Sequence, residues 1–196
     1  MPRKPRKPRT RRQKRIMSSA ASLLLLVGLS SHSIGDKCGG SDRWDVKVLS
    51  DTSAHNVDLR HPIFTSIAGL DTFRPPVWKQ KLKRQPAEMN AYTIECEIEH
   101  YKWENDDDIH FQLVDGSHQM VGELPDPFCP DAVASGNSRK YDLARKHFDA
   151  VAAHGEYKNH RFRITGVLHF DQINHASGGA DNGAELHPIT KLEVIH

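Results

Sequence analysis

Residues 88–196 are predicted to form a mainly β domain that contains a single helix. Two patterns in the sequence support this prediction. Five segments alternate apolar and polar residues, as strands with one buried face do, and one segment repeats its apolar residues with the period of a helix. The helical segment lies between the third and the fourth strand segment, and this order restricts the folds that the domain can adopt.

Three strands open the domain, and their expected bounds are residues 92–102, 108–115 and 119–124. In the first strand Ile94, Cys96 and Ile98 share one face, while glutamates occupy the positions between them. The dipeptide Asp115-Gly116 separates the second strand from the third and is typical of a tight turn between antiparallel strands. We therefore expect these two strands to form a hairpin.

A helix is expected next, over residues 138–154. Asn137 or Ser138 is a suitable N-cap, and Gly155 ends the helix. One face is apolar, and it consists of Tyr141, Ala144, Phe148 and Val151. Two more strands follow, at residues 161–171 and 185–195. Pro188 has no N–H to donate, so the last strand must lie at a sheet edge or contain a bulge there.

Three strands, a helix and two strands follow one another in the order of an OB-fold, a five-stranded barrel with its helix between strands three and four. The alternative is another small α+β sheet that is covered by one helix. OB-folds bind ligands on the face of strands two and three and with the loops that join strands one to two and four to five. In this chain those loops are residues 103–108 and 172–183.

The N-terminal segment differs in composition from the rest of the chain. Nine Lys and Arg residues lie among the first fifteen, and an apolar run from Ala20 to Leu29 follows them. A basic segment, a short apolar run and then small polar residues are typical of a secretory signal peptide, here residues 1–35. The alternative is a basic tail that contacts nucleic acid, but five consecutive aliphatic residues at 23–27 argue against it. The run is also shorter than the roughly 20 residues of a membrane span.

The chain that remains after such a signal is acidic. From Cys38 onward it has 17 Lys and Arg residues against 24 Asp and Glu residues, a net charge of −7. This charge repels phosphates, so nucleic acid is disfavoured as a partner unless a metal or a local basic patch intervenes. Residues 36–87 are rich in proline and are expected to form an arm that packs on the barrel, with a short edge strand at 42–48.

Three cysteines remain to be assigned. Cys96 lies on the apolar face of its strand and is expected to be a small buried hydrophobic residue. Cys38 and Cys129 are then left as a candidate disulfide, which an exported protein can form, although an odd number of cysteines permits other pairings. The spacing of cysteines and histidines matches no zinc motif.

Acidic and imidazole side chains gather in the two loops and at the strand ends beside them. Three consecutive aspartates repel one another, and a cation would relieve this repulsion. The candidate metal ligands are Asp106, Asp108 and His110, and the candidate binding residues are Glu123, Asp171, His175 and Asn182. The alternative for the aspartates is a solvated acidic turn. A divalent metal (Zn²⁺, Mn²⁺ or Ca²⁺) is the one cofactor that this pattern suggests.

Glu185 and His187 open the last strand. They are two residues apart, so their side chains point to the same face. A carboxylate and an imidazole in this arrangement can act as acid and base, as paired metal ligands, or as a structural hydrogen-bonded pair. We take them as the candidate catalytic residues and keep the structural pair as the alternative.

Five blocks of sequence also allow a comparison with known proteins. They contain Cys38, Gly39, Arg43, Trp44, Val46 and Lys47; Glu104, Asp106, Asp108 and His110; Glu123, Pro125, Pro127 and Cys129; Gly166, Phe170 and Asp171; and Asn182, Gly183, Glu185, Leu186, His187 and Pro188. In these blocks the chain resembles a family of uncharacterised secreted bacterial proteins. The resemblance implies export from a bacterial cell and a disulfide between Cys38 and Cys129, but it implies no activity.

Two functions are compatible with these patterns. The first is an exported ligand-binding module of the OB type, located in the periplasm or outside the cell, that recognises a small ligand or a cell-envelope partner. The second is a metal-dependent hydrolase, acting for example on phosphodiesters, in which the acidic and histidine residues hold a metal that activates water.

Overall fold

The computed structural model describes residues 38–39, 43–79, 81–153, 155–173 and 178–195. All of the described residues belong to one compact unit. The predicted signal peptide at residues 1–35 lies outside the described residues, and so does the candidate binding residue His175.

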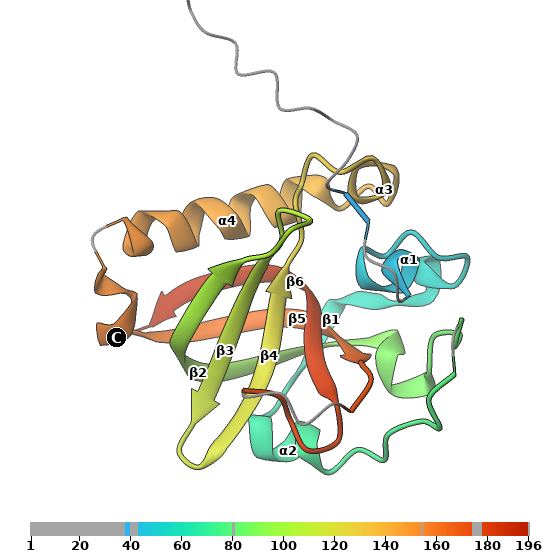
Figure 1. Ribbon diagram of the computed structural model, residues 1–196, viewed down its shortest axis with the longest axis horizontal. Coiled ribbons are helices and arrows are strands. Elements are labelled where there is room, and N and C mark those ends of the chain that lie inside the picture. Colours follow the sequence, from blue (N-terminus) through green and yellow to red (C-terminus); the bar gives the residue numbers. More distant parts are fainter. Residues whose placement is uncertain (1–37, 40–42, 80, 154, 174–177, 196) are drawn as a thin grey trace, which may run out of the picture. The chain divides into compact units, whose positions relative to one another are not determined.

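Five strands form a closed barrel, as predicted (Figure 1). They are β2 (Asn90–Trp103), β3 (Ile109–Asp115), β4 (His118–Leu124), β5 (Arg161–Phe170) and β6 (Ala184–Ile195). Their order around the barrel is β2-β3-β4-β6-β5, and β5 pairs with β2 to close it. The β4–β6 pair is parallel and the other barrel pairs are antiparallel. Helix α4 (Ser138–Ala152) follows β4 and lies across one end of the barrel, so the OB-like fold is confirmed.

Strand β2 can belong to both halves of the barrel because it is long. Its first half pairs with β5 and its second half pairs with β3. The register with β3 shifts between Ile98 and His100, which is where the strand leaves one neighbour for the other.

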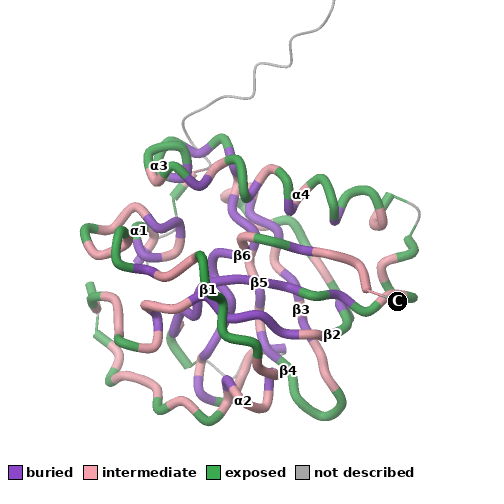
Figure 2. The backbone as a smooth tube through the Cα atoms, turned by 180° about the vertical axis from the view of Figure 1, so that it is seen from behind, coloured by how far each residue is buried: buried purple, intermediate pink, exposed green. Residues whose placement is uncertain are grey.

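The inside of the barrel is apolar, as the alternation in the sequence predicts. Ile109, Phe111 and Leu113 of β3 are fully buried, and Figure 2 shows the same burial along the central strands. Phe148 of α4 closes the barrel end, with its ring 4.7 Å from that of Phe111. Gly122 leaves room for the side chain of Leu113 inside the barrel, because a Cβ atom at residue 122 would lie only 2.8 Å from it.

Pro188 lies in a bulge. The register between β5 and β6 shifts on both sides of Gly166, which pairs with Ile189, the residue after the proline. A Cβ atom on Gly166 would lie 3.0 Å from the carbonyl oxygen of Pro188, so the two strands approach closely at this point. Strand β6 has a neighbour on each side, and the bulge therefore accommodates the proline within the barrel.

In the arm, the prediction of an edge strand at residues 42–48 is wrong. Arg43 has a left-handed backbone (φ 56°), and helix α1 (Trp44–Lys47) begins directly after it. The extra strand is β1 (Asp58–Phe64), which pairs in parallel with β2 outside the barrel. The remaining short elements are η1 (Ala54–Asn56), α2 (Ile67–Asp71), η2 (Pro86–Met89), α3 (Pro130–Ala134) and η3 (Glu156–Asn159).

A disulfide between Cys38 and Cys129 joins the arm to the start of α3, and Cys96 is free and buried. Trp44 strengthens the same junction, because its indole Nε1–H donates to Asp131 at 3.0 Å. Among the described residues, no helix is long and apolar enough to cross a lipid bilayer.

Candidate functional site

A layer of charged side chains lies between the outside of the barrel wall and the arm. In β6 Leu186 points into the apolar core, so Glu185 and His187 on either side of it point outward. His169 of β5 alternates with core residues in the same way. These side chains are nevertheless buried, because arm residues cover them. We call this layer the buried charged cluster; it consists of Arg43, Lys47, Glu88, Asp108, Glu123, His169, Glu185 and His187.

Arg43 and Glu88 form a fully buried ion pair within the cluster. Two guanidinium nitrogens of Arg43 contact the two oxygens of Glu88 at 2.8 and 2.6 Å, in the bidentate geometry that arginine and carboxylate favour. Arg43 also donates to the carbonyls of Leu82 and Phe170, and Glu88 accepts from the N–H groups of Gln85 and Phe170. The pair therefore connects the arm to the end of β5.

His169 connects this ion pair to Glu185. Burial lowers the pKa of His169 below its ordinary value, against the contact with Glu185, which raises it. The ring is therefore neutral at pH 7. Its Nδ1–H donates to Glu185 at 2.8 Å, and its Nε2 accepts from Arg43 at 3.3 Å.

Lys47 of α1 brings a second cation to the cluster. Its ammonium lies 3.7 Å from Glu185 and 3.6 Å from Asp171. Burial would lower the pKa of Lys47, but these carboxylates and Glu123 outweigh burial and raise it. Burial would likewise raise the pKa of Glu185, but the charge of Lys47 and the hydrogen bond from His169 lower it. Both groups are therefore charged at neutral pH.

His187 lies among three carboxylates. Its Nδ1 is 2.9 Å from Glu123 and 3.6 Å from Glu185, and its Nε2 is 3.6 Å from Asp108. Burial alone would lower the pKa of His187, but Glu123, Asp108 and Glu185 together raise it well above the ordinary value. Burial also raises the pKa of Asp108. In the metal-free protein the imidazole is therefore protonated at neutral pH.

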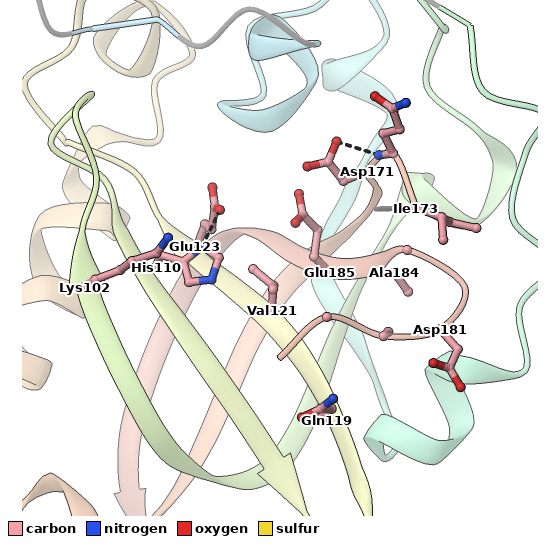
Figure 3. A pocket seen from close by; sticks show the side chains of 14 residues that line it. Lys102, His110, Gln119, Val121, Glu123, Asp171, Ile173, Asp181, Ala184 and Glu185 are labelled. Atoms are coloured by element: carbon pink, nitrogen blue, oxygen red, sulfur yellow. Dashed lines mark hydrogen bonds and ion pairs between the residues drawn. The ribbon is translucent and has the colours of Figure 1, made fainter. Parts of the chain in front are cut away.

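A pocket of about 320 Å³ lies on the surface beside this cluster (Figure 3). Its walls come from the outward faces of β3 and β4, the start of β6 and the loop between β5 and β6. Glu123 and Glu185 belong both to the pocket lining and to the cluster. Figure 3 shows their carboxylates and that of Asp171 reaching to the same side of the sheet.

The structure brings most of the predicted site residues to this region. His110, Glu123, Asp171 and Glu185 line the pocket, whereas Asp108 and His187 belong to the buried cluster. Glu185 and His187 point to the same face, as expected from their spacing.

Two predicted site residues lie outside the pocket lining and make hydrogen bonds that shape loops. The side chain of Asp106 accepts from the N–H of Asp108, at the turn before β3. The amide of Asn182 donates to the carbonyls of Leu70 and Phe73 and accepts from the N–H of Ala184, so it holds the β5–β6 loop against α2.

Sequence reasoning missed four members of the cluster, namely Arg43, Lys47, Glu88 and His169. One of them left a usable signal. His169 occupies an outward position in a strand, directly opposite Glu185 in the next strand. Arg43 and Lys47 come from the arm, and their contacts with the barrel depend on pairs that are far apart in the sequence.

The chain matches no protein-family model and no curated protein in the comparisons made. The functional inference therefore depends on the fold and on the geometry of the site.

Removing the buried cation of the Arg43–Glu88 pair should be costly. We expect Arg43→Met to lower the free energy of unfolding by about 3–5 kcal/mol, because Glu88 stays buried without its partner. Urea unfolding would measure this change. Adding Glu88→Gln should restore part of the loss, since an uncharged amide oxygen still accepts from Phe170. As a control, Lys146→Met breaks the exposed Lys146–Asp142 pair and should cost about 0.5 kcal/mol or less. If Arg43→Met and Lys146→Met lose equal stability, the Arg43–Glu88 pair does not stabilise the protein as a buried ion pair.

The neutral state of His169 makes its contribution to stability dependent on pH. Its folded pKa lies below the ordinary 6.5, so the unfolded chain binds a proton first as the pH falls through 6.5. The stability that the neutral ring supplies is present above 6.5 and is lost on acidification. We therefore expect His169→Asn to destabilise the protein more at about pH 7.5 than at about pH 5 in urea unfolding. The exposed control His55→Asn should show no such difference.

Proposed function

We propose that this chain is a ligand-binding module of the OB type, and that the pocket beside β3, β4 and β6 takes its ligand. The observation that carries this proposal is the position of the pocket. OB-folds bind their ligands on the face of the second and third barrel strands and with the loop between the last two. Here these elements are β3, β4 and the β5–β6 loop, which supply most of the lining.

The charge of the lining favours a small polar ligand with a positive group. Carboxylates of Glu123, Asp171, Asp181 and Glu185 line the pocket, against one lysine, Lys102. Lys47 offsets part of this charge from behind. A volume of about 320 Å³ lies at the small end of the range of ligand sites, so an amine or amino sugar fits better than a polymer.

The proposed setting of this module is the periplasm or the exterior of a bacterial cell. The disulfide between Cys38 and Cys129 supports it, because disulfides persist in oxidising compartments. The resemblance to secreted bacterial proteins and the signal-like N-terminus point to the same location. In that setting, an amino sugar or amine of the cell envelope is a suitable ligand.

A metal-dependent hydrolase is the second candidate. The observation in its favour is a group of three side chains, Asp108, Glu123 and His187, that could hold a metal ion next to the pocket. A hydrolase also needs a coordination position that water and substrate can reach. The side chains of Asp108 and His187 are only 1 % exposed, and that of Glu123 is 15 % exposed. Any access would therefore pass Glu123.

The ligand proposal predicts binding that depends on charge and on free space in the pocket. We expect glucosamine or putrescine to bind in calorimetry, whereas N-acetylglucosamine and glucuronate, which lack the cation, should bind weakly or not at all. Val121→Trp should fill the pocket and weaken binding at least about tenfold.

Val133→Trp supplies the matched control, because Val133 is an exposed residue of α3 outside the pocket lining. It should leave binding unchanged. If none of the cations binds, or if both tryptophan variants behave alike, the pocket is not the ligand site.

Hydrolysis gives a separate readout for the second candidate. A hydrolase should turn over bis(p-nitrophenyl) phosphate once Zn²⁺ or Mn²⁺ is added, and Glu185→Gln should abolish the turnover. If Glu185→Gln folds, binds metal and hydrolyses as the parent protein does, Glu185 has no catalytic role.

A further inference from the structure

Three side chains from separate elements converge in a part of the cluster where none of them forms an ion pair with Arg43. Asp108 directly precedes β3, Glu123 belongs to β4, and His187 belongs to β6. The parallel β4–β6 register aligns Gly122 with Leu186, which places Glu123 and His187 side by side on the outer face. One ligand atom from each of the three residues lies within 4.8 Å of the other two.

In both Asp108 and Glu123, one carboxylate oxygen contacts another residue and the other oxygen faces His187. Oδ1 of Asp108 accepts the backbone N–H of Asp126 at 2.8 Å, which leaves Oδ2 toward His187. Oε1 of Glu123 contacts Nδ1 of His110 at 2.9 Å, which leaves Oε2 toward His187. Metal ligands are commonly oriented in this way by hydrogen bonds from surrounding groups.

Asp108 and His187 contain buried polar atoms that lack hydrogen bonds. Within the described part of the chain, Oδ2 of Asp108 and both ring nitrogens of His187 make none. Both carboxylates are near enough to His187 for ion pairs, but Oε2 of Glu123 lies out of line with the Nδ1–H direction, and Oδ2 of Asp108 lies 3.6 Å from Nε2, beyond hydrogen-bond distance. Buried polar atoms without partners are costly, and native proteins satisfy nearly all of them with protein, water or an ion.

A metal ion bound to one ring nitrogen of His187 satisfies that nitrogen and Oδ2 of Asp108 better than a proton does. An imidazolium needs each acceptor along an N–H bond, whereas a metal on the ring nitrogen has its other ligands arranged around itself. In a tetrahedral zinc site with bonds of about 2.0–2.1 Å, ligand atoms are about 3.3 Å apart. The 3.6 Å between Nε2 of His187 and Oδ2 of Asp108 is close to this spacing.

The donor set indicates which metal fits. One imidazole nitrogen and two carboxylate oxygens suit Zn²⁺ and similar transition ions. Ca²⁺ takes six to eight oxygens and Mg²⁺ keeps most of its waters, so neither matches a nearly dry site with a nitrogen donor. Glu185 is held by His169 and Lys47, which leaves a fourth position to water on the side of Glu123 and the pocket.

We propose that Asp108, Glu123 and His187 form a divalent transition-metal site, best suited to Zn²⁺, that joins the start of β3 to β4 and β6 behind the wall of the pocket. The site does not depend on the proposed ligand or on hydrolysis. It accounts for the burial of the Asp108 carboxylate beside a histidine whose ring nitrogens lack hydrogen-bond partners.

The test uses the full chain, disulfide-bonded, purified without a histidine tag and dialysed against a chelator. Zn²⁺ titration by calorimetry and metal content by mass spectrometry should give one ion per chain. Co²⁺ bound in its place should show the intense visible bands of tetrahedral coordination. Asp108→Asn and His187→Gln should each weaken Zn²⁺ binding by at least about tenfold to a hundredfold, or abolish it.

Matched substitutions separate this site from other groups. Glu104 and His110 form a second cluster with Glu123, closer to solvent. Glu104→Gln and the exposed His118→Gln should leave Zn²⁺ binding intact. If Glu104→Gln abolishes binding while Asp108→Asn does not, the metal lies on the pocket side and the proposal is overturned.

Two further outcomes are decisive. Should His187→Gln fail to fold by circular dichroism, the isosteric Asp108→Asn variant still decides the matter. Absence of Zn²⁺ binding by the parent protein would also overturn the proposal. Val121→Trp should keep the metal even where it blocks a ligand, so the two proposals can fail separately.

Discussion

The buried carboxylates beside the barrel need positively charged partners, and two cations of the arm form ion pairs with them. Taking an ion out of water costs several kcal/mol, so a carboxylate such as Glu88 or Glu185 is tolerated beneath a covering segment only beside an opposite charge. Arg43 and Lys47 lie one helical turn apart and provide these charges. The position of the arm on the barrel follows from this pairing.

The same constraint explains the left-handed backbone of Arg43. A strand through residues 42–48 would direct alternate side chains to opposite faces, so Arg43 and Lys47 would share a face with Asp45. The turn at Arg43 followed by a short helix instead directs both cations toward β5 and β6. Bidentate contacts with Glu88 then offset an uncommon backbone conformation.

The barrel could be predicted from the sequence because its signals are local. Alternation in β3, the apolar stripe of α4 and the bulge at Pro188 can each be recognised within a short stretch of sequence. The charged cluster is different, because its members come from the arm, the loop before β3 and the late strands β5 and β6, and they meet only after these segments have come together. Strand β1 was missed because its signal is weak: it is mostly exposed and contains Pro62, which an edge strand can accommodate.

The double pairing of β2 has a consequence for the order in which the chain assembles. Contacts of β2, β3 and β4 join neighbouring segments, whereas its contacts with β5 join residues far apart in the chain, with α4 between them. Closing a long loop costs more entropy than closing a short one, so the three-stranded meander can form first and serve as a template. Until β5 arrives, the first half of β2 presents an open edge, and β1 can protect only one side of it.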